Sequence, residues 1–175
     1  ADALAYAMNP DGNPATNDGA DVINLSLSAS QPTNLLPDIV AGNTCDDDDD
    51  CPNTQQGAVV IAAAGNNGSS LPEFPASEGV AGMLAVGAIK SDGGLAAFSN
   101  FGSWVHLAAP GEQILSSVPG PDVYGVWSGT SMAAPLVAGQ AALVRAAYPN
   151  LDPPTVVTRI LSTSEDVGGL VPLRT

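Results

Sequence analysis

The stretch GAVVIAAA, residues Gly57–Ala64, is a continuous apolar run, and it ends in the turn residues Gly65–Gly68. A short apolar run that is closed by turn residues is typical of a strand buried on both faces of a parallel sheet. Two further runs, Met83–Ile89 and Trp104–Ala108, have the same character, and Pro110 follows the second. The sequence therefore predicts a set of buried, parallel strands.

Helical patterns alternate with these strands. Ser131–Tyr148 is the strongest of them, and small and apolar residues cover almost its whole circumference, so we expect a buried helix. Pro153 and Pro154 open a last helix that extends to about Leu161, with Asp152 as its N-cap. Buried strands that alternate with helices predict an α/β fold with a mostly parallel sheet.

Shorter elements complete this pattern. Ala20–Leu27 contains β-branched residues in partial alternation and is expected to be a strand. Asp2–Met8 is expected to be the end of a helix, and Thr33–Ala41 a short helix that its proline limits. Residues 113–128 alternate weakly around Pro119–Asp122, which predicts a hairpin.

The composition limits the number of domains and the classes of partner that the chain can have. A chain of 175 residues, 45% of them hydrophobic, fits one domain or a large part of one. Its 18 Asp and Glu against 4 Lys and Arg give a net charge of −14, which would repel polyanions and excludes nucleic-acid binding. The longest apolar stretch, Met132–Val144, is interrupted by Pro135 and Gly139 and is too short to span a membrane.

Two cysteines, Cys45 and Cys51, flank the acidic run Asp46–Asp50. They are close enough to close a small ring through a disulfide, and two free thiols are the alternative. A disulfide would suit an oxidising compartment, and we expect a secreted protein. The acidic run offers hard oxygen ligands for a structural calcium ion, but its adjacent carboxylates repel one another, so a solvated acidic loop is the alternative.

Two segments carry candidate chemistry. GTSMAAP, residues Gly129–Pro135, places Ser131 at the start of the strongest helix, where free backbone N–H groups and the helix dipole favour an oxyanion. An ordinary N-cap serine is the alternative. AAAGN, residues Ala62–Asn66, places a carboxamide beyond the end of a buried strand, at the sheet edge where α/β proteins bind ligands. That amide can donate to a developing negative charge, or it is a turn asparagine.

Together these segments resemble the subtilisin-like serine peptidase family. GTSMAAP resembles the nucleophile signature of that family, and AAGN after a strand resembles its oxyanion-hole signature. Val22–Leu27 is similar to the substrate-lining strand, and Phe98–Gly102 (FSNFG) and Ala108–Gly111 (AAPG) match the framework in order and spacing. The resemblance covers about residues 20–162 and implies a three-layer αβα sandwich with a mostly parallel sheet.

The resemblance also implies an activity, that of a serine endopeptidase acting on proteins or peptides without a cofactor for the chemistry. Ser131 would be the nucleophile, and Asn66 with the Ser131 N–H would form the oxyanion hole. Glu73 would lie near the floor of the primary specificity pocket, where an anion favours Lys or Arg, and a solvated loop glutamate is the alternative. The same resemblance gives the other substrate-binding residues: Ser26, Leu27, Ser28, Ala63, Ala64, Gly65 and Thr130.

The sequence departs from the family in its acid–base groups. The family order is Asp, His, Ser, and both Asp and His would precede residue 20. The single histidine, His106, lies in a framework match and is expected to be a structural or a surface histidine, and Leu136 stands where the family usually has His. We therefore expect residues 1–175 to be the C-terminal part of one peptidase domain, inactive alone, with an N-terminal fragment that carries Asp and His as partner. A non-catalytic module that binds peptides or serves as a scaffold is the alternative.

Overall fold

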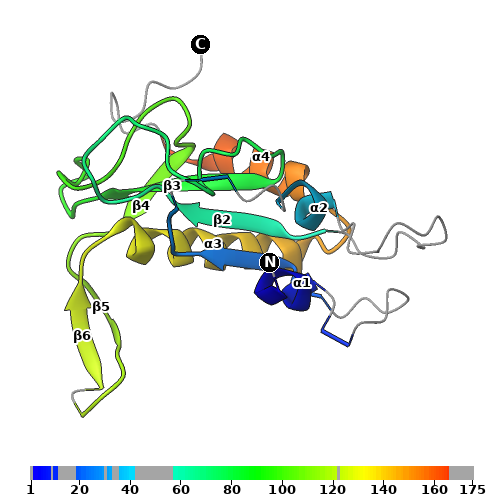
Figure 1. Cartoon of the computed structure of the whole chain (residues 1–175), viewed down its shortest axis with the longest axis horizontal. Coiled ribbons are helices and arrows are strands. Elements are labelled where there is room, and N and C mark those ends of the chain that lie inside the picture. Colours follow the sequence, from blue (N-terminus) through cyan, green and yellow to red (C-terminus); the bar gives the residue numbers. More distant parts are fainter. Residues whose placement is uncertain are drawn as a thin grey trace.

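The computed structural model describes residues 2–8, 10–11, 19–29, 31–32, 36–41, 57–121 and 123–165. Helices and strands alternate along the first part of the chain, and a hairpin precedes the last two helices (Figure 1). In chain order the elements are α1 (Asp2–Met8), β1 (Val22–Leu25), α2 (Leu36–Ala41), β2 (Val59–Ala63), β3 (Met83–Ile89), β4 (Leu107–Pro110), β5 (Ile114–Ser117), β6 (Tyr124–Trp127), α3 (Thr130–Ala147) and α4 (Pro153–Thr163).

The central sheet has the order β1-β2-β3-β4, and each neighbouring pair is parallel. Strand β2 is buried along its whole length, and β3 is buried except at its last residue. Both strands lie in the apolar runs that predicted them. A strand buried on both faces needs a layer of helices on each side of the sheet.

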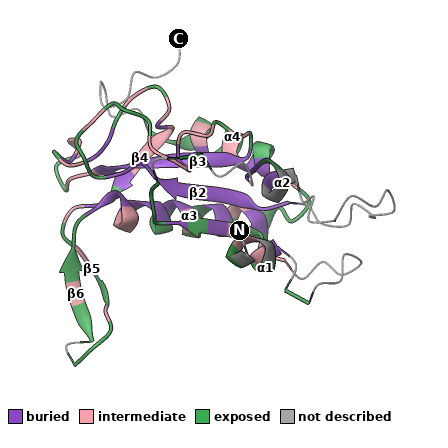
Figure 2. Cartoon of the chain, viewed as in Figure 1, coloured by how far each residue is buried: buried purple, intermediate pink, exposed green. Residues whose placement is uncertain are grey.

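Alternate residues of β2 pack against different helices. Val59 and Ile61 belong to one core cluster, which includes residues of α3 and α4. Val60 belongs to a second cluster, which includes Met8 of α1 and Leu36 of α2. The sheet therefore lies between two helical layers, and the predicted three-layer α/β architecture is confirmed. Figure 2 shows the resulting band of buried residues through the centre of the molecule.

Helix α3 differs from the expectation of a helix buried all round. Small side chains of the helix, such as Ala133 and Ala141, are fully buried towards the sheet. Leu136 and Leu143 lie elsewhere on its circumference and are 49% and 74% exposed. The sequence pattern is apolar on all sides, but burial depends on neighbours, and within the part of the chain described here these two leucines remain open to solvent.

Helix α4 begins as predicted. The Asp152 carboxylate accepts the backbone N–H of Thr155 at 2.8 Å, which satisfies one of the free donors of the first turn. Hydrogen bonds from Thr155, first from its side chain and then from its backbone, hold the pKa of Asp152 below its usual value, because they favour the charged carboxylate. Asp152 is therefore the N-cap, and two prolines follow it in the first turn.

The strand predicted at Trp104–Ala108 is displaced towards the C-terminus, and β4 covers Leu107–Pro110 instead. Val105 closes a turn by donating its N–H to the Gly102 carbonyl at 3.0 Å, so the chain becomes extended only afterwards. The ladder with β3 starts where Leu107 lies opposite Val86.

The hairpin predicted in residues 113–128 is confirmed as the antiparallel pair β5–β6, in which Ile114 lies opposite Trp127 and Ser117 opposite Tyr124. It projects from the body of the molecule (Figure 1), and Leu115 and Trp127 are 67% and 55% exposed.

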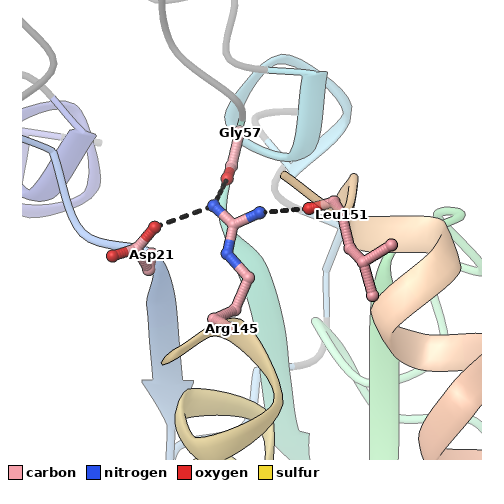
Figure 3. Close-up of polar contacts among 4 residues, drawn as sticks. All are labelled: Asp21, Gly57, Arg145 and Leu151. Atoms are coloured by element: carbon pink, nitrogen blue, oxygen red, sulfur yellow. Dashed lines mark hydrogen bonds and ion pairs between the residues drawn. The ribbon is translucent and has the colours of Figure 1, made fainter. Parts of the chain in front are cut away.

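Arg145, in the last turn of α3, joins four parts of the fold (Figure 3). Its side chain is 5% exposed, and Nη2 donates to Asp21 Oδ1 at 2.8 Å and to the Gly57 carbonyl at 3.1 Å. Nη1 donates to the Leu151 carbonyl at 2.5 Å. These partners lie just before β1, just before β2 and in the α3–α4 turn. A positive charge also complements the carboxyl end of the α3 dipole.

Some sequence predictions fall on residues outside the described ranges. They concern the Cys45–Cys51 disulfide, the calcium ligands in Asp46–Asp50 and the start of the predicted helix at residues 33–35. Among the helices that are described, none combines the length and apolarity needed to cross a bilayer.

Candidate active site

The amino end of α3 meets the carboxyl end of β2. Strand β2 ends at Ala63, the backbone N–H of Ala64 still donates to Val86 of β3 at 2.9 Å, and the chain then turns through Gly65 and Asn66. Helix α3 begins at Thr130, so Ser131 lies in its first turn. The structure therefore brings together the two segments that the sequence singled out.

Thr130 orients the amide of Asn66. Asn66 Oδ1 accepts the Thr130 backbone N–H at 2.8 Å and the Thr130 hydroxyl at 3.0 Å. The same hydroxyl oxygen accepts the Gly65 N–H at 3.1 Å. Because both bonds occupy the amide oxygen, Nδ2 is the atom that remains to donate into the site. Thr130 is fully buried, so the contact that it makes with the site runs through Asn66, and its predicted role in substrate binding stays a prediction.

Ser131 is held against the end of β1. Its hydroxyl donates to the Ser26 carbonyl at 3.3 Å, and the Ser26 hydroxyl donates to the Ser131 carbonyl at 2.9 Å. Asn24 Nδ2 in turn donates to the Ser26 hydroxyl at 2.9 Å. The Ser131 N–H belongs to the first turn of α3, where N–H groups have no partner within the helix. It therefore adds a second potential donor beside Asn66.

A pocket of about 410 Å³ opens beside these groups. It is lined by Ser131 and Met132 of α3, by Asn66 of the turn after β2, and by Trp127 and Ser128 at the end of β6. The α3 dipole makes the potential at this end of the helix positive. A pocket that contains a hydroxyl nucleophile, an amide donor and a helix amino end can stabilise an oxyanion that forms on a bound carbonyl.

The predicted substrate-binding segments follow β1 and lie at the end of β2, two neighbouring strands of the sheet. Residues 26–28 follow β1 as an exposed segment without regular secondary structure, in which Leu27 is 57% exposed. Just after them, Ala29 exchanges two backbone hydrogen bonds with Phe74, at 2.7 and 3.1 Å, which ties this segment to the Glu73 loop. Ala63, Ala64 and Gly65 are buried where β2 ends.

Glu73 lies against the turn that carries Asn66. Its Oε1 accepts hydrogen bonds from Nδ2 of Asn67 and, at 3.0 Å, from Nδ2 of Asn100. A Cβ atom added to Gly65 would collide with the Glu73 carboxylate, so the carboxylate lies directly beside the backbone of Gly65, a predicted substrate-binding residue. Glu73 is half-buried and bonded, which differs from a freely solvated loop glutamate.

The whole sequence, residues 1–175, matches the family model described as the subtilase family. The chain belongs to the subtilase family. The sequence resemblance to subtilisin-like peptidases is thereby confirmed, and the geometry around Asn66 and Ser131 can be read as that of a subtilase.

Relatives and solved structures agree with this assignment. A thermophilic serine proteinase of Bacillus sp. (strain AK1) is 44% identical over 144 residues, which are 82% of this chain and 31% of that protein. An extracellular protease of Xanthomonas campestris pv. campestris is 36% identical over 180 residues, which cover 97% of this chain and 29% of that protein. The crystal structure of a cold-adapted subtilisin-like serine proteinase superposes with a TM-score of 0.71 and 31% identity over 95% of this chain and 53% of that one. The chain thus spans about half or less of the length of each.

His106 has a structural position in this subtilase. Its ring atom Nδ1 accepts the Ala85 N–H at 2.8 Å, and its backbone N–H donates to the Ala85 carbonyl at 3.0 Å. The ring nitrogen therefore takes the place of a backbone carbonyl in the pairing with β3. Leu136, the other departure from the family pattern, lies on the exposed surface of α3. In the described part of the chain, no three His, Cys, Asp or Glu side chains gather to hold a metal ion.

Three features of this subtilase site were not predicted from the sequence. Trp127 and Met132 line the pocket, and Asn100 binds the turn that carries Asn66. Met132 and Asn100 stood in segments already quoted, the nucleophile signature and the FSNFG framework match. The side-chain direction of Met132 cannot be read from the sequence, and the partners of Asn100 are distant in sequence. An asparagine amide can satisfy several backbone groups at once, but the sequence does not show which groups those are.

Proposed function

We propose that the protein is a serine endopeptidase that hydrolyses peptide bonds through an acyl-enzyme on Ser131. The observation that carries the proposal is the Asn66 amide, which lines the same pocket as Ser131 and whose oxygen accepts two hydrogen bonds from Thr130, so that its nitrogen is the atom left to donate. A donor fixed in this way needs no reorganisation when charge develops on the substrate. Membership of the subtilase family supports the same reaction.

The proposed reaction proceeds in two steps. The Ser131 oxygen attacks the scissile carbonyl while its proton passes to a histidine base, and Asn66 and the Ser131 N–H hold the oxyanion. Collapse expels the amine, which takes the proton from the histidine, and the acyl group stays on Ser131. Water then attacks the ester, the base takes a proton from it, and the acid product and the Ser131 hydroxyl are released.

We propose that an N-terminal segment of the same domain supplies the Asp and His of the triad. In the described structure the Ser131 hydroxyl donates to the neutral Ser26 carbonyl, which cannot act as a base. Three observations support such a partner: the chain covers only part of its relatives, β1 ends the sheet order, and Leu136 and Leu143 of α3 are open to solvent. We also propose secretion, which the name of the Xanthomonas relative, an extracellular protease, supports.

Labelling with a fluorophosphonate probe tests the proposed function. The protein that includes the N-terminal segment is expected to react at Ser131, located by peptide mass mapping, and Ser131→Ala is expected to abolish the reaction. Ser128→Ala, at another pocket-lining serine, is the matched control and should leave Ser131 labelled. Absence of labelling although Asp and His are present would contradict the proposal and favour a non-catalytic peptide-binding module.

We further propose that Glu73 makes the primary specificity pocket selective for Lys or Arg. Its carboxylate lies directly beside Gly65, one of the predicted substrate-binding residues. Glu73→Gln keeps the size and an acceptor oxygen, so it should lower kcat/KM for Lys and Arg substrates at least about 10-fold, as expected for loss of a charge-assisted hydrogen bond. Peptides that differ only at that residue measure the effect.

The same peptide panel contains the controls. Peptides with Leu or Phe at that position should be cleaved at similar rates by the wild type and by Glu73→Gln, since they offer no charge. Glu165→Gln, after α4, removes a charge of the same sign and should change neither series. An equal response of charged and neutral peptides to Glu73→Gln would remove the specificity role.

A further inference from the structure

Asn100 is fully buried and binds the backbone on both sides of Asn66. Its Nδ2 donates to the Ala64 carbonyl at 2.9 Å, and its backbone N–H donates to the Gly65 carbonyl at 3.0 Å. Its Oδ1 accepts the N–H groups of Asn67 and Ser69 at 3.0 and 3.1 Å. One side chain thus uses its donor and its acceptor to hold the turn just before and just after Asn66.

This support begins where the sheet stops. The last ladder bond before the turn is the one from the Ala64 N–H to Val86, so β3 does not define the backbone beyond it. Thr130 fixes the amide of Asn66, but it cannot fix the path of the chain on both sides. Because the geometry of an oxyanion donor must hold to within about 1 Å for full effect, the backbone that carries Asn66 needs its own constraint.

Glu73 determines which way the Asn100 amide points. Its Oε1 accepts from Asn100 Nδ2 at 3.0 Å, so the nitrogen faces Glu73 and Ala64 and the oxygen faces the two N–H groups. Gly65 leaves no space between these groups and the turn, since a Cβ atom there would collide with the Asn100 amide and the Glu73 carboxylate. The side chains of Asn100 and Glu73 therefore lie in direct contact with the backbone next to Asn66.

We propose that Asn100 is a positioning residue for catalysis, which acts by holding the Ala64–Ser69 turn so that Asn66 Nδ2 meets the developing oxyanion. The proposal rests on the peptidase function proposed above. Asn100 belongs to the FSNFG segment and would act without contacting the substrate or the nucleophile. It also connects the Glu73 loop to the oxyanion donor through a single buried side chain.

A double-mutant cycle with Asn66 tests this role in the protein that includes the N-terminal segment. Asn100→Ala should lower kcat for a peptide substrate about 10- to 100-fold with little change in KM, as expected for a displaced catalytic group. In an Asn66→Ala background the same substitution should lower kcat less than about threefold, because the group that it positions is already gone. Ser99→Ala is the control: Ser99 is also buried, but its hydroxyl bonds to Ala88 and to the Asn100 carbonyl, and the substitution should leave kcat unchanged.

Asn100→Asp provides a second readout, and it also serves if Asn100→Ala does not fold. The introduced carboxylate keeps the acceptor for Asn67 and Ser69 but lies against the Glu73 carboxylate, which raises the pKa of the introduced group. Protonation restores a donor, so the ratio of variant to wild-type kcat should rise as pH falls.

Two results would overturn the role of Asn100 while wild type remains active. One is an equal loss of kcat from Asn100→Ala in the wild-type and Asn66→Ala backgrounds. The other is a ratio of Asn100→Asp kcat to wild-type kcat that does not change with pH. A wild-type protein that includes Asp and His but shows no turnover would instead overturn the peptidase function itself.

Discussion

Replacing Asn66 by Ala is expected to lower kcat about 100- to 1000-fold, a magnitude taken from the equivalent asparagine of subtilisin itself rather than worked out from these distances. The substitution removes Nδ2, the donor that remains because the amide oxygen is occupied by Thr130, and it does not alter Ser131 itself. KM should change little, because the donor acts mainly on charge that develops after the substrate has bound. Steady-state kinetics on a peptide amide substrate, with the N-terminal segment present, measures both constants.

Two further variants separate the donor from its surroundings. Asn66→Asp keeps the oxygen that accepts from Thr130 but directs a second oxygen into the pocket, so it should be at least as damaging as Asn66→Ala. Asn67→Ala removes the neighbouring amide, which donates to Glu73 and not into the pocket. This substitution should lower kcat less than about tenfold. A similar loss for Asn66→Ala and Asn67→Ala would show that the turn, and not the donor, matters.

Much of the fold could be predicted because its determinants are local. The apolar run Gly57–Ala64 closed by turn residues gave a fully buried β2, and Asp152 before two prolines gave the start of α4. Burial of α3 could not be predicted in the same way, since its pattern says which residues can be buried but not which of them find a neighbour. The displaced start of β4 depends on a turn at Gly102–Val105 that has no strong signature.

The candidate site shows the same division. Asn66 and Ser131 stand in short motifs whose chemistry can be read residue by residue, and the structure brings those motifs together. The supporting contacts connect positions far apart: Asn100 bonds to Ala64 and Asn67 across 36 and 33 residues, and Arg145 bonds to Asp21 across 124. No period or spacing in the sequence encodes such pairs, so only the folded chain reveals them.

Replacing Arg145 by Ala is expected to lower the free energy of unfolding by about 2–6 kcal/mol, because two backbone carbonyls each lose their donor at about 1–3 kcal/mol. The guanidinium is 5% exposed, and its loss leaves the Gly57 and Leu151 carbonyls without their donor and leaves a cavity at the end of α3. Arg145→Lys should recover little of this loss, because an ammonium group cannot reproduce the planar fork that reaches three acceptors. Denaturant unfolding in a Ser131→Ala background, which prevents autolysis, measures the change.

Arg159 on α4 is the matched control for Arg145. It lies on the surface, with its guanidinium 4.1 Å from the centre of the Tyr148 ring and 2.8 Å from the Tyr148 hydroxyl, so Arg159→Ala should cost only about 1 kcal/mol. Asp21→Asn should also cost little, since the Asp21 side chain is 72% exposed and the amide oxygen can still accept from Arg145. If Arg145→Ala cost no more than Arg159→Ala, the backbone carbonyls would be satisfied by water, and the four segments would be held by apolar packing alone. A large cost for Arg145→Ala with a small one for Asp21→Asn would instead assign the stabilisation to the two carbonyl bonds, because the charge of Asp21 would then contribute little.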